Sequence, residues 1–299
     1  MKSINFNIYY KKFGFLSLIF IVISLSLLFF KGLNFGVDFK GGTLIEIRIE
    51  NSIHSVSKVR DVFGNSNLTN LTVKNFGNDK DYIIKFEKQN LDNPEFINNL
   101  KKNVSKSFPD INFRRVENVG PKVSSELLKS GIIAISLSLA AMLFYIWIRF
   151  EWQFSLGAIA ALFHDVIITL GIFSLLSLEI NLSIVAAVLT IVGYSMNDTV
   201  VIFDRVRDNL RKYADINIFE LTNQSINETL SRTILTSVTT LLALLSIFFL
   251  GGEILRGFSL AMILGVIIGT YSSIYIANPI LVKLNVDHNT VVKKDEEKN

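Results

Sequence analysis

Residues 193–205 read Gly193-Tyr194-Ser195-Met196-Asn197-Asp198-Thr199-Val200-Val201-Ile202-Phe203-Asp204-Arg205, and they close an apolar run that begins at Leu182. Such a run is typical of a membrane-spanning helix, which needs about 20 apolar residues. The run nevertheless carries a carboxylate, and an ionised Asp at the bilayer centre costs roughly 2.5–3.5 kcal/mol on insertion scales. We therefore expect Asp198 to face a partner or a water-filled cavity. There it would titrate in a proton pathway, or bond through Asn197 and Thr199 to neighbouring helices as a structural residue.

Other charge-poor runs in the chain have a similar length. The six runs cover residues 13–30, 131–148, 154–178, 182–203, 233–250 and 257–282. The total composition decides less, because 50% hydrophobic residues is close to what soluble domains contain. We predict an integral membrane protein: an all-α bundle of six transmembrane helices with an inserted α+β domain.

The distribution of basic residues predicts the orientation of these helices. Lys2, Lys11 and Lys12 precede the first run, so the positive-inside rule places the N-terminus in the cytoplasm. No small-x-small cleavage site follows the first run, so we expect an uncleaved span rather than a signal peptide. Alternation of the spans then puts further basic residues inside as well: Arg149, Arg205, Arg207, Arg211, Lys212, Lys283, Lys293 and Lys294.

The spans divide the chain into four parts. Residues 1–30 form a cytoplasmic segment and the first span, and residues 31–130 form an outer domain. A five-helix transmembrane part, 131–282, includes a cytoplasmic loop at 204–232, which is long and polar enough to hold an amphipathic helix along the inner surface. The charged tail, 283–299, is expected to be disordered.

The outer insert carries the patterns of a small α+β domain. Residues 43–50 alternate between apolar and charged side chains, which is typical of a half-buried strand. The remaining patterns predict a helix at 56–64, strands at 71–74 and 82–86 joined by a turn at 77–79, a helix starting at Asn93-Pro94, and a strand at 111–116. This order is that of the ferredoxin-like split arrangement, and no catalytic constellation is visible in it.

Two glycine-bearing motifs flank the outer domain. Residues 36–43 contain Gly36, Asp38, Gly41 and Gly42, and Gly120-Pro121 precede the second span. Paired glycines permit backbone shapes that other residues cannot adopt. Residues 36–43 form either a plain turn, which spacing alone favours, or an element that couples the span to the outer domain. Gly120-Pro121 marks the return of the chain toward the membrane, and we expect it to belong to the same coupling motifs.

A second intramembrane carboxylate lies in the third span. Gly157, Ala161, Asp165 and Thr169 recur at every fourth residue and so share one helix face. Such a small and polar stripe suits close helix contact, so we expect Asp165 to pair helices, with proton carrying as the alternative. His164 is adjacent and is expected to point elsewhere, because successive helical residues do not face each other.

Two further intramembrane features concern the last spans. Arg232 opens the fifth span on the cytoplasmic side, where an ion pair with Asp198 is geometrically reasonable and would keep the carboxylate ionised. A permanent salt bridge or snorkelling of Arg232 to lipid headgroups is the alternative. The last span carries small residues at every fourth position, which predicts a flat face for another helix backbone: Gly257, Ala261, Gly265, Gly269, Ser273 and Ala277.

Several functions lack their sequence signals. The chain has no Cys, hence no disulfide and no thiolate metal site, and it carries no nucleotide-binding Gly-Lys-Ser/Thr motif. We expect neither an enzyme nor a bound metal or cofactor, and energy drawn from an ion gradient or from a partner. The basic clusters orient helices in the lipid, so we expect no nucleic-acid partner.

The motifs together resemble a known family. Residues 36–43, Val119-Gly120-Pro121, residues 148–152 with His164-Asp165, and above all residues 193–205 are similar to those of the SecF subunits of the SecD/SecF protein-export family. The resemblance covers nearly the whole chain except the tail. The family usually has Gly where this chain has Ser124.

The resemblance implies a half-transporter of the resistance-nodulation-division superfamily in the bacterial inner membrane. Its implied partners are SecD, the SecYEG channel, the accessory proteins YajC and YidC, and the translocating preprotein. The proton-motive force would drive late export steps after the ATP-dependent work of SecA. The family's proton-pathway Asp matches Asp198, its Arg in the next span matches Arg232, and Asp165 matches a further motif residue.

Three alternatives remain open at this point. A proton-coupled solute exporter of the same superfamily usually carries two outer inserts and two sets of spans, and this chain shows one of each. A non-transporting scaffold of the export channel would not need the Asp198 carboxylate. An intramembrane hydrolase would need Asp165 and Asp198 to line one cavity, and no hydrolase motif accompanies them.

Overall fold

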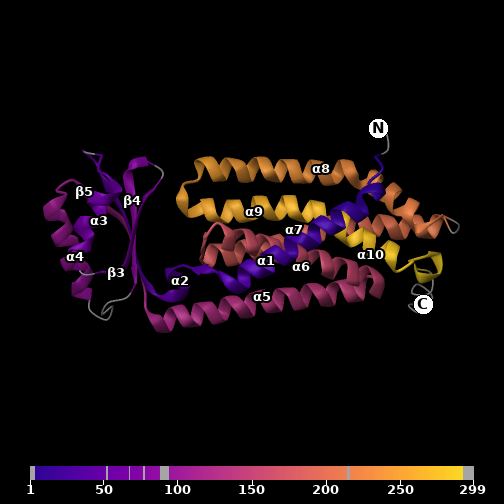
Figure 1. Cartoon of the computed structure of the whole chain (residues 1–299), viewed down its shortest axis with the longest axis horizontal. Coiled ribbons are helices and arrows are strands. Elements are labelled where there is room, and N and C mark those ends of the chain that lie inside the picture. The colour runs from indigo at the N-terminus through magenta and orange to yellow at the C-terminus, as the bar shows by residue number, and fades with distance from the viewer. Residues whose placement is uncertain are drawn as a thin grey trace.

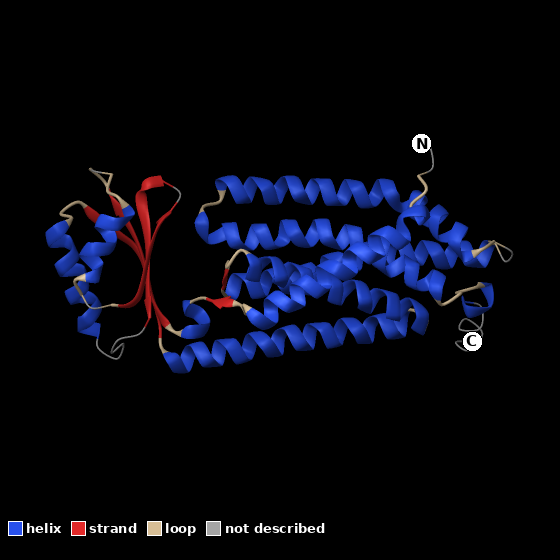
Figure 2. Cartoon of the chain, in the orientation of Figure 1, coloured by secondary structure: helices blue, strands red, loops and turns tan. Residues whose placement is uncertain are grey.

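The computed structural model describes residues 4–51, 53–66, 68–76, 78–87, 94–213 and 216–291. A bundle of long helices carries a small sheet with two covering helices at one end, and both chain termini lie toward the opposite end (Figure 1). Figure 2 shows that the strands are concentrated in this end domain, apart from a short pair beside the bundle.

Among the described residues, six helices are long and apolar enough to cross a membrane, in agreement with the six predicted runs. They include α1 Tyr10–Phe30, α5 Pro121–Arg149, α6 Trp152–Leu175, α7 Leu182–Lys212, α8 Ile218–Leu250 and α9 Glu253–Ser272. The last span continues from α9 through a π-helical turn, Ser273–Ala277, into α10, Asn278–Lys283.

The helices differ in how deeply they lie in the bundle. In the most apolar stretches of α6 and α7, and of the last span, 50–56% of the residues are buried inside the chain. The corresponding share for the spans of α1, α5 and α8 is 11–17%, so these three helices leave wide apolar faces for lipid or another subunit. The helices α6, α7 and α9 therefore form the centre of the bundle.

Small side chains allow the central helices to approach closely. A Cβ added at Gly265 would lie 2.3 Å from Ile191, and one at Gly269 would lie 3.0 Å from Ser195. The flat face predicted on the last span thus packs against α7 of the same chain. Gly157 on α6 makes a similar close contact: a Cβ added there would lie 2.8 Å from the carbonyl oxygen of Ala277.

The end domain is a four-stranded antiparallel sheet with strand order β3-β4-β2-β5. Its elements are β2 Gly42–Ile49, α3 Val56–Gly64, β3 Thr69–Phe76, β4 Asn78–Glu87, α4 Pro94–Ser107 and β5 Ile111–Val119. This is the predicted strand-helix-strand-strand-helix-strand order; Gly77 of the expected turn and Asn93 of the expected helix start lie outside the described residues. Ile45, Ile47 and Ile49 face α3 and α4 as their alternation predicts, and the other face of the sheet looks toward the bundle (Figure 1).

The prediction for residues 204–232 was wrong in one respect. No separate surface helix forms among the described residues of this loop: α7 continues to Lys212 and α8 begins at Ile218. The two extensions are joined by polar contacts, since the Asn209 amide donates to Ser225 Oγ at 2.9 Å and Arg205 pairs with Glu228 at 2.5 Å. These paired side chains allow both helices to extend beyond the apolar stretch.

Candidate functional site

Asp198 lies in the interior of the bundle on α7, with 2% of its surface exposed. Its Oδ2 accepts a long hydrogen bond of 3.3 Å from Thr270 Oγ1 on α9. The Thr270 hydroxyl is also 2.8 Å from Ser237 Oγ on α8. Because Thr270 donates its hydrogen to the carboxylate, Ser237 is the donor to Thr270. A chain of hydroxyls therefore connects α8 and α9 to this carboxylate.

The expected ion pair between Asp198 and Arg232 is absent from this structure. Arg232 lies on the exposed side of α8, and among the described residues no ion pair joins it to Asp198. Asp198 is hydrogen-bonded to Thr270 of α9 in the interior, whereas the Arg232 side chain is exposed on α8, beyond ion-pair distance but near enough for its charge to act on the carboxylate. The structure also exposes Asn197 but buries Thr199, whose hydroxyl lies 2.8 Å from Ser273 Oγ.

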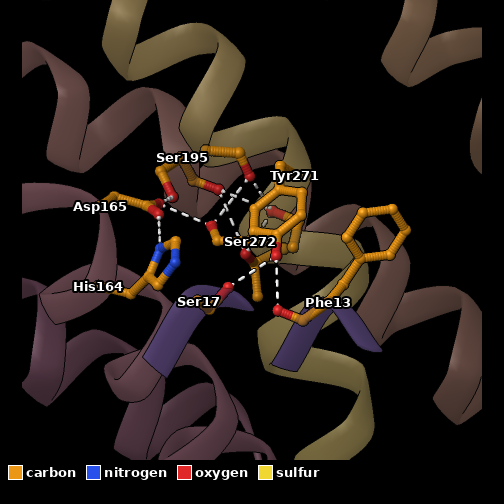
Figure 3. A network of polar contacts seen from close by, with 10 residues as sticks. Phe13, Ser17, His164, Asp165, Ser195, Tyr271 and Ser272 are labelled. Atoms are coloured by element: carbon orange, nitrogen blue, oxygen red, sulfur yellow. Dashed lines mark hydrogen bonds and ion pairs between the residues drawn. The ribbon is translucent and has the colours of Figure 1, made fainter. Parts of the chain in front are cut away.

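Asp165 on α6 is the centre of a denser network (Figure 3). The residue is fully buried, and its Oδ2 accepts hydrogen bonds from Ser195 Oγ of α7 at 2.5 Å and Ser272 Oγ of α9 at 2.7 Å. Its Oδ1 lies 2.8 Å from His164 Nδ1. The carboxylate thus joins the three central helices, which is the helix-pairing arrangement expected from its stripe.

The expectation that His164 points away from Asp165 was wrong. The spacing rule describes the directions of Cβ atoms, and two side chains with rotatable bonds can still turn toward each other between adjacent positions. Both side chains are buried, so each gains more from the other than from the surrounding hydrocarbon.

A tyrosine extends the network to α1 (Figure 3). Tyr271 Oη donates to the Phe13 carbonyl at 2.8 Å, so Ser17 Oγ, 2.7 Å away, must donate to Tyr271 Oη. The Tyr271 ring stacks on His164 with ring centroids 5.9 Å apart. Tyr271 and the serines at 17, 195 and 272 were not predicted as site residues; their signal in the sequence is a hydroxyl repeatedly placed within otherwise apolar runs.

The Gly-bearing segment 36–42 lies against the start of α7. The short strands β1 Asn34–Phe35 and β6 Glu179–Ile180 pair in parallel, and Gly36 N donates to the Ile180 carbonyl at 2.8 Å. One turn of helix follows, α2 Val37–Lys40, and Asp38 Oδ2 accepts from Leu182 N at 2.9 Å. Asp38 therefore caps the N-terminus of the helix that carries Asp198.

The glycines of the two motifs are not equivalent. Gly42 has φ 146°, and an added Cβ would lie 2.6 Å from the Phe86 carbonyl oxygen. At Gly36 an added Cβ would lie 2.8 Å from Glu179 Oε1. Gly41 is likewise in the left-handed region, with φ 80°. Gly120 meets nothing within 4 Å and serves as the N-cap position before Pro121, so close packing does not require a glycine there.

The sheet and the bundle are also connected by an ion pair between Lys85 of β4 and Glu179 of β6. Glu179 lies three residues before Leu182, the first residue of α7. The ion pair therefore contacts the chain close to the N-terminus of α7, where Asp38 also binds. Within the described ranges, no three His, Asp or Glu side chains gather in a group that could hold a metal ion.

Comparisons with known proteins agree with these motifs. Residues 99–287 match the model for "Protein export membrane protein SecD/SecF, C-terminal", and residues 26–53 match the "SecD/SecF GG Motif". The chain is 49% identical over 250 residues to the protein translocase subunit SecF of Rickettsia bellii, covering 83% of this chain and 82% of that protein. It is 44% identical to the SecF of Cereibacter sphaeroides over 264 residues, which cover 86% of this chain and 82% of the relative.

Two solved structures share the fold. The crystal structure of SecDF from Thermus thermophilus aligns with a TM-score of 0.85 and 34% identity, covering 94% of this chain and 38% of that one. A structure of SecDF in its super-membrane-facing form aligns with a TM-score of 0.71 and 33% identity, covering 100% of this chain and 40% of the other. The chain thus spans about two-fifths of the length of these SecDF chains.

Proposed function

The chain belongs to the SecD/SecF family of protein-export membrane proteins, as a SecF-type subunit of the protein translocase, and from this membership we propose that it couples the proton-motive force to late, SecA-independent steps of preprotein export. In this export step its partner is a SecD subunit, and the pair acts at the SecYEG channel. The names of the curated relatives, each a protein translocase subunit SecF, support a partner of this kind. The apolar outer faces of α1, α5 and α8 offer surface for it.

The proposal places the chain in the bacterial inner membrane, with both termini in the cytoplasm and a ferredoxin-like domain in the periplasm. The strand order of the end domain supports this fold assignment. The extensions of α7 and α8 lie at the end of the bundle opposite the sheet. The extension of α7 carries four of the basic residues on which the positive-inside rule acts: Arg205, Arg207, Arg211 and Lys212.

Asp198 carries the proposal. It is buried among three helices with a long hydrogen bond to Thr270, so the surroundings stabilise its charge less than those of Asp165, which has three close donors. A carboxylate of this kind can take up and release a proton as its surroundings change. A closer approach of Arg232 would favour the ionised form, and its withdrawal would favour proton uptake.

The experiment replaces Asp198 by Asn, which keeps the volume and removes the charge. Export of a preprotein into inverted membrane vesicles is followed with an imposed proton gradient, in the presence of SecD and SecYEG. We expect Asp198→Asn to lose the gradient-dependent export while still co-purifying with SecD. Asp208→Asn, an exposed position on the same helix, is the matched control and should retain it.

Retention of gradient-dependent export by Asp198→Asn would contradict a motor role and favour a scaffold. If the chain were a solute exporter, a strain lacking this subunit would become sensitive to small toxic molecules while its preprotein export stayed normal.

A further inference from the structure

The Asp165 network leaves one buried nitrogen without a hydrogen bond. His164 is 2% exposed, and its Nε2 has no partner in the part of the chain that the structure describes. Buried polar atoms are generally paired, so an exception of this kind asks for an explanation. The other ring nitrogen is fully engaged with Asp165 at 2.8 Å.

The hydrogen-bond partners determine where a proton can be added. Ser195 and Ser272 both donate to Asp165 Oδ2, which leaves Oδ1 for His164. If the carboxylate is ionised it offers only lone pairs, so Nδ1 carries the hydrogen and Nε2 is a bare lone pair. An added proton then resides on Nε2, whether the bridging hydrogen stays on Nδ1 or moves to Asp165.

Charge favours such an addition. With one proton the His164–Asp165 pair has a net charge of −1, and with two protons it is neutral. A buried site of low dielectric favours the neutral state, because an uncompensated charge is costly there. The titratable groups that face the ring are Asp165 on its own helix and Tyr271 on α9, while α1 and α7 contribute the hydroxyls of Ser17 and Ser195 to the network.

We infer that His164 binds a proton at Nε2, so that the His164–Asp165 pair is a second proton site in the membrane interior, separate from Asp198. This inference rests on the proposed function, in which protons move through the bundle. The two sites share one helix interface. Ser195, a donor to Asp165, lies three residues before Asp198 on α7, and Ser272, another donor to Asp165, lies two residues after Thr270 on α9. A change in the α7–α9 contact that accompanies protonation at one site therefore reaches the other.

The direct test reads the protonation state of the ring. The full chain is labelled with ¹⁵N-histidine and reconstituted with SecD in lipid nanodiscs, and ¹⁵N NMR spectra are recorded between about pH 8 and pH 5, where histidines usually titrate. The chain has three histidines, and a His54→Asn/His288→Asn variant leaves His164 as the only signal. We expect the bare-nitrogen signal of Nε2 at high pH to be replaced by a protonated one at low pH. A single protonation state across this range overturns the inference.

An export assay gives an independent reading. His164→Asn keeps a donor close to the place of Nδ1 and removes Nε2, so the Asp165 bond is retained while the proton position is lost. We expect its gradient-driven export to lose the pH dependence of the wild type. His288→Asn is the matched control, since its Nδ1 lies 2.8 Å from the Leu210 carbonyl outside the apolar spans, and it should keep the wild-type profile.

An unchanged pH profile in a co-purifying His164→Asn subunit counts against the inference. The NMR titration uses the native His164, so it remains decisive if the variant fails to assemble. The proposed function is judged by Asp198→Asn and can fail or stand independently of both readings.

Discussion

Asp81 in the outer domain accepts two hydrogen bonds from the Arg48 guanidinium, at 2.6 and 2.7 Å. These bonds hold the pKa of Asp81 below its usual range. A carboxyl group with a lowered folded-state pKa contributes stability above its unfolded value of about 3.9, and that contribution is lost as the pH falls through the folded pKa.

We therefore predict that Asp81→Asn destabilises the outer domain at pH 7 by roughly 1–2 kcal/mol and that its effect is smaller near pH 3, below the unfolded pKa. Hydrogen exchange of β2 and β4 in the full chain, with rates corrected for pH, measures the difference. Asp287→Asn is a suitable control, because its lowered pKa arises from a local bond to Thr290 beyond the spans. An equal loss of protection at both pH values would contradict the prediction.

The sequence identified the buried carboxylates of the site but not the side chains with which they interact. The cost of a buried charge singled out Asp165 and Asp198 from their apolar runs. Their partners depend on rotamers and on the rotation of each helix about its axis, which the sequence does not encode locally. For this reason His164 was expected to face away from Asp165, and an ion pair was expected for Arg232, which lies on the outer side of α8.

At the scale of single elements, the α7–α9 contact depends on glycine. We predict that Gly265→Ala destabilises the protein by about 1–3 kcal/mol, because the new methyl group would overlap Ile191. Gly193→Ala on α7 is the control: an added Cβ meets nothing within 4 Å there, and Ala is the better helix former. Thermal unfolding in detergent compares the two variants, and equal midpoints would refute the close contact.

The last span shows what element-level patterns leave out. Its apolar run predicts a helix over 257–282, and the helix indeed occupies that length, but with a π-helical turn at Ser273–Ala277. Pro279 has no N–H to donate to the carbonyl of Tyr275, four residues earlier. In the same turn, the side-chain amide of Asn278 donates to the Ser273 carbonyl at 2.7 Å. The proline was visible in the sequence, but the way in which the helix adapts to it follows from packing against α6.

At the scale of the molecule, the outer domain and the bundle are joined by the Lys85–Glu179 ion pair as well as by the chain itself. Both side chains are partly exposed, so the pair contributes less than about 1 kcal/mol to stability. Its expected role is to hold the sheet against the start of α7. We predict that Lys85→Glu lowers gradient-driven export and that the swapped pair Lys85→Glu/Glu179→Lys restores much of it.

The readouts are the export assay and, as a check on folding, the thermal midpoint, which should differ little among the three variants. Lys80→Glu, on the same strand near the far end of the sheet, is the control and should export normally. Failure of the swapped pair to recover any export would show that the two positions act separately.

The order of the spans and of the outer-domain strands and helices followed from the sequence, because membrane thickness fixes the length of an apolar run and the alternation of Ile45, Ile47 and Ile49 fixes the face of a strand. The short pair of β1 and β6 and the single turn α2 were not predicted. The neighbours of each helix did not follow. The stripe from Gly257 to Ala277 predicted a close helix contact, but its partner could be identified as α7 only from the arrangement in space.

The cap that Asp38 places on α7 has a mechanical consequence. Leu182, whose amide it accepts, lies sixteen residues before Asp198, or about 24 Å along a stiff rod. A pull on the end of α7 that lies near the sheet would be transmitted along the helix axis to Asp198, and it would slide Asp198 past Thr270. A force on a preprotein bound to the outer domain and the protonation of Asp198 would then be mechanically coupled through α7.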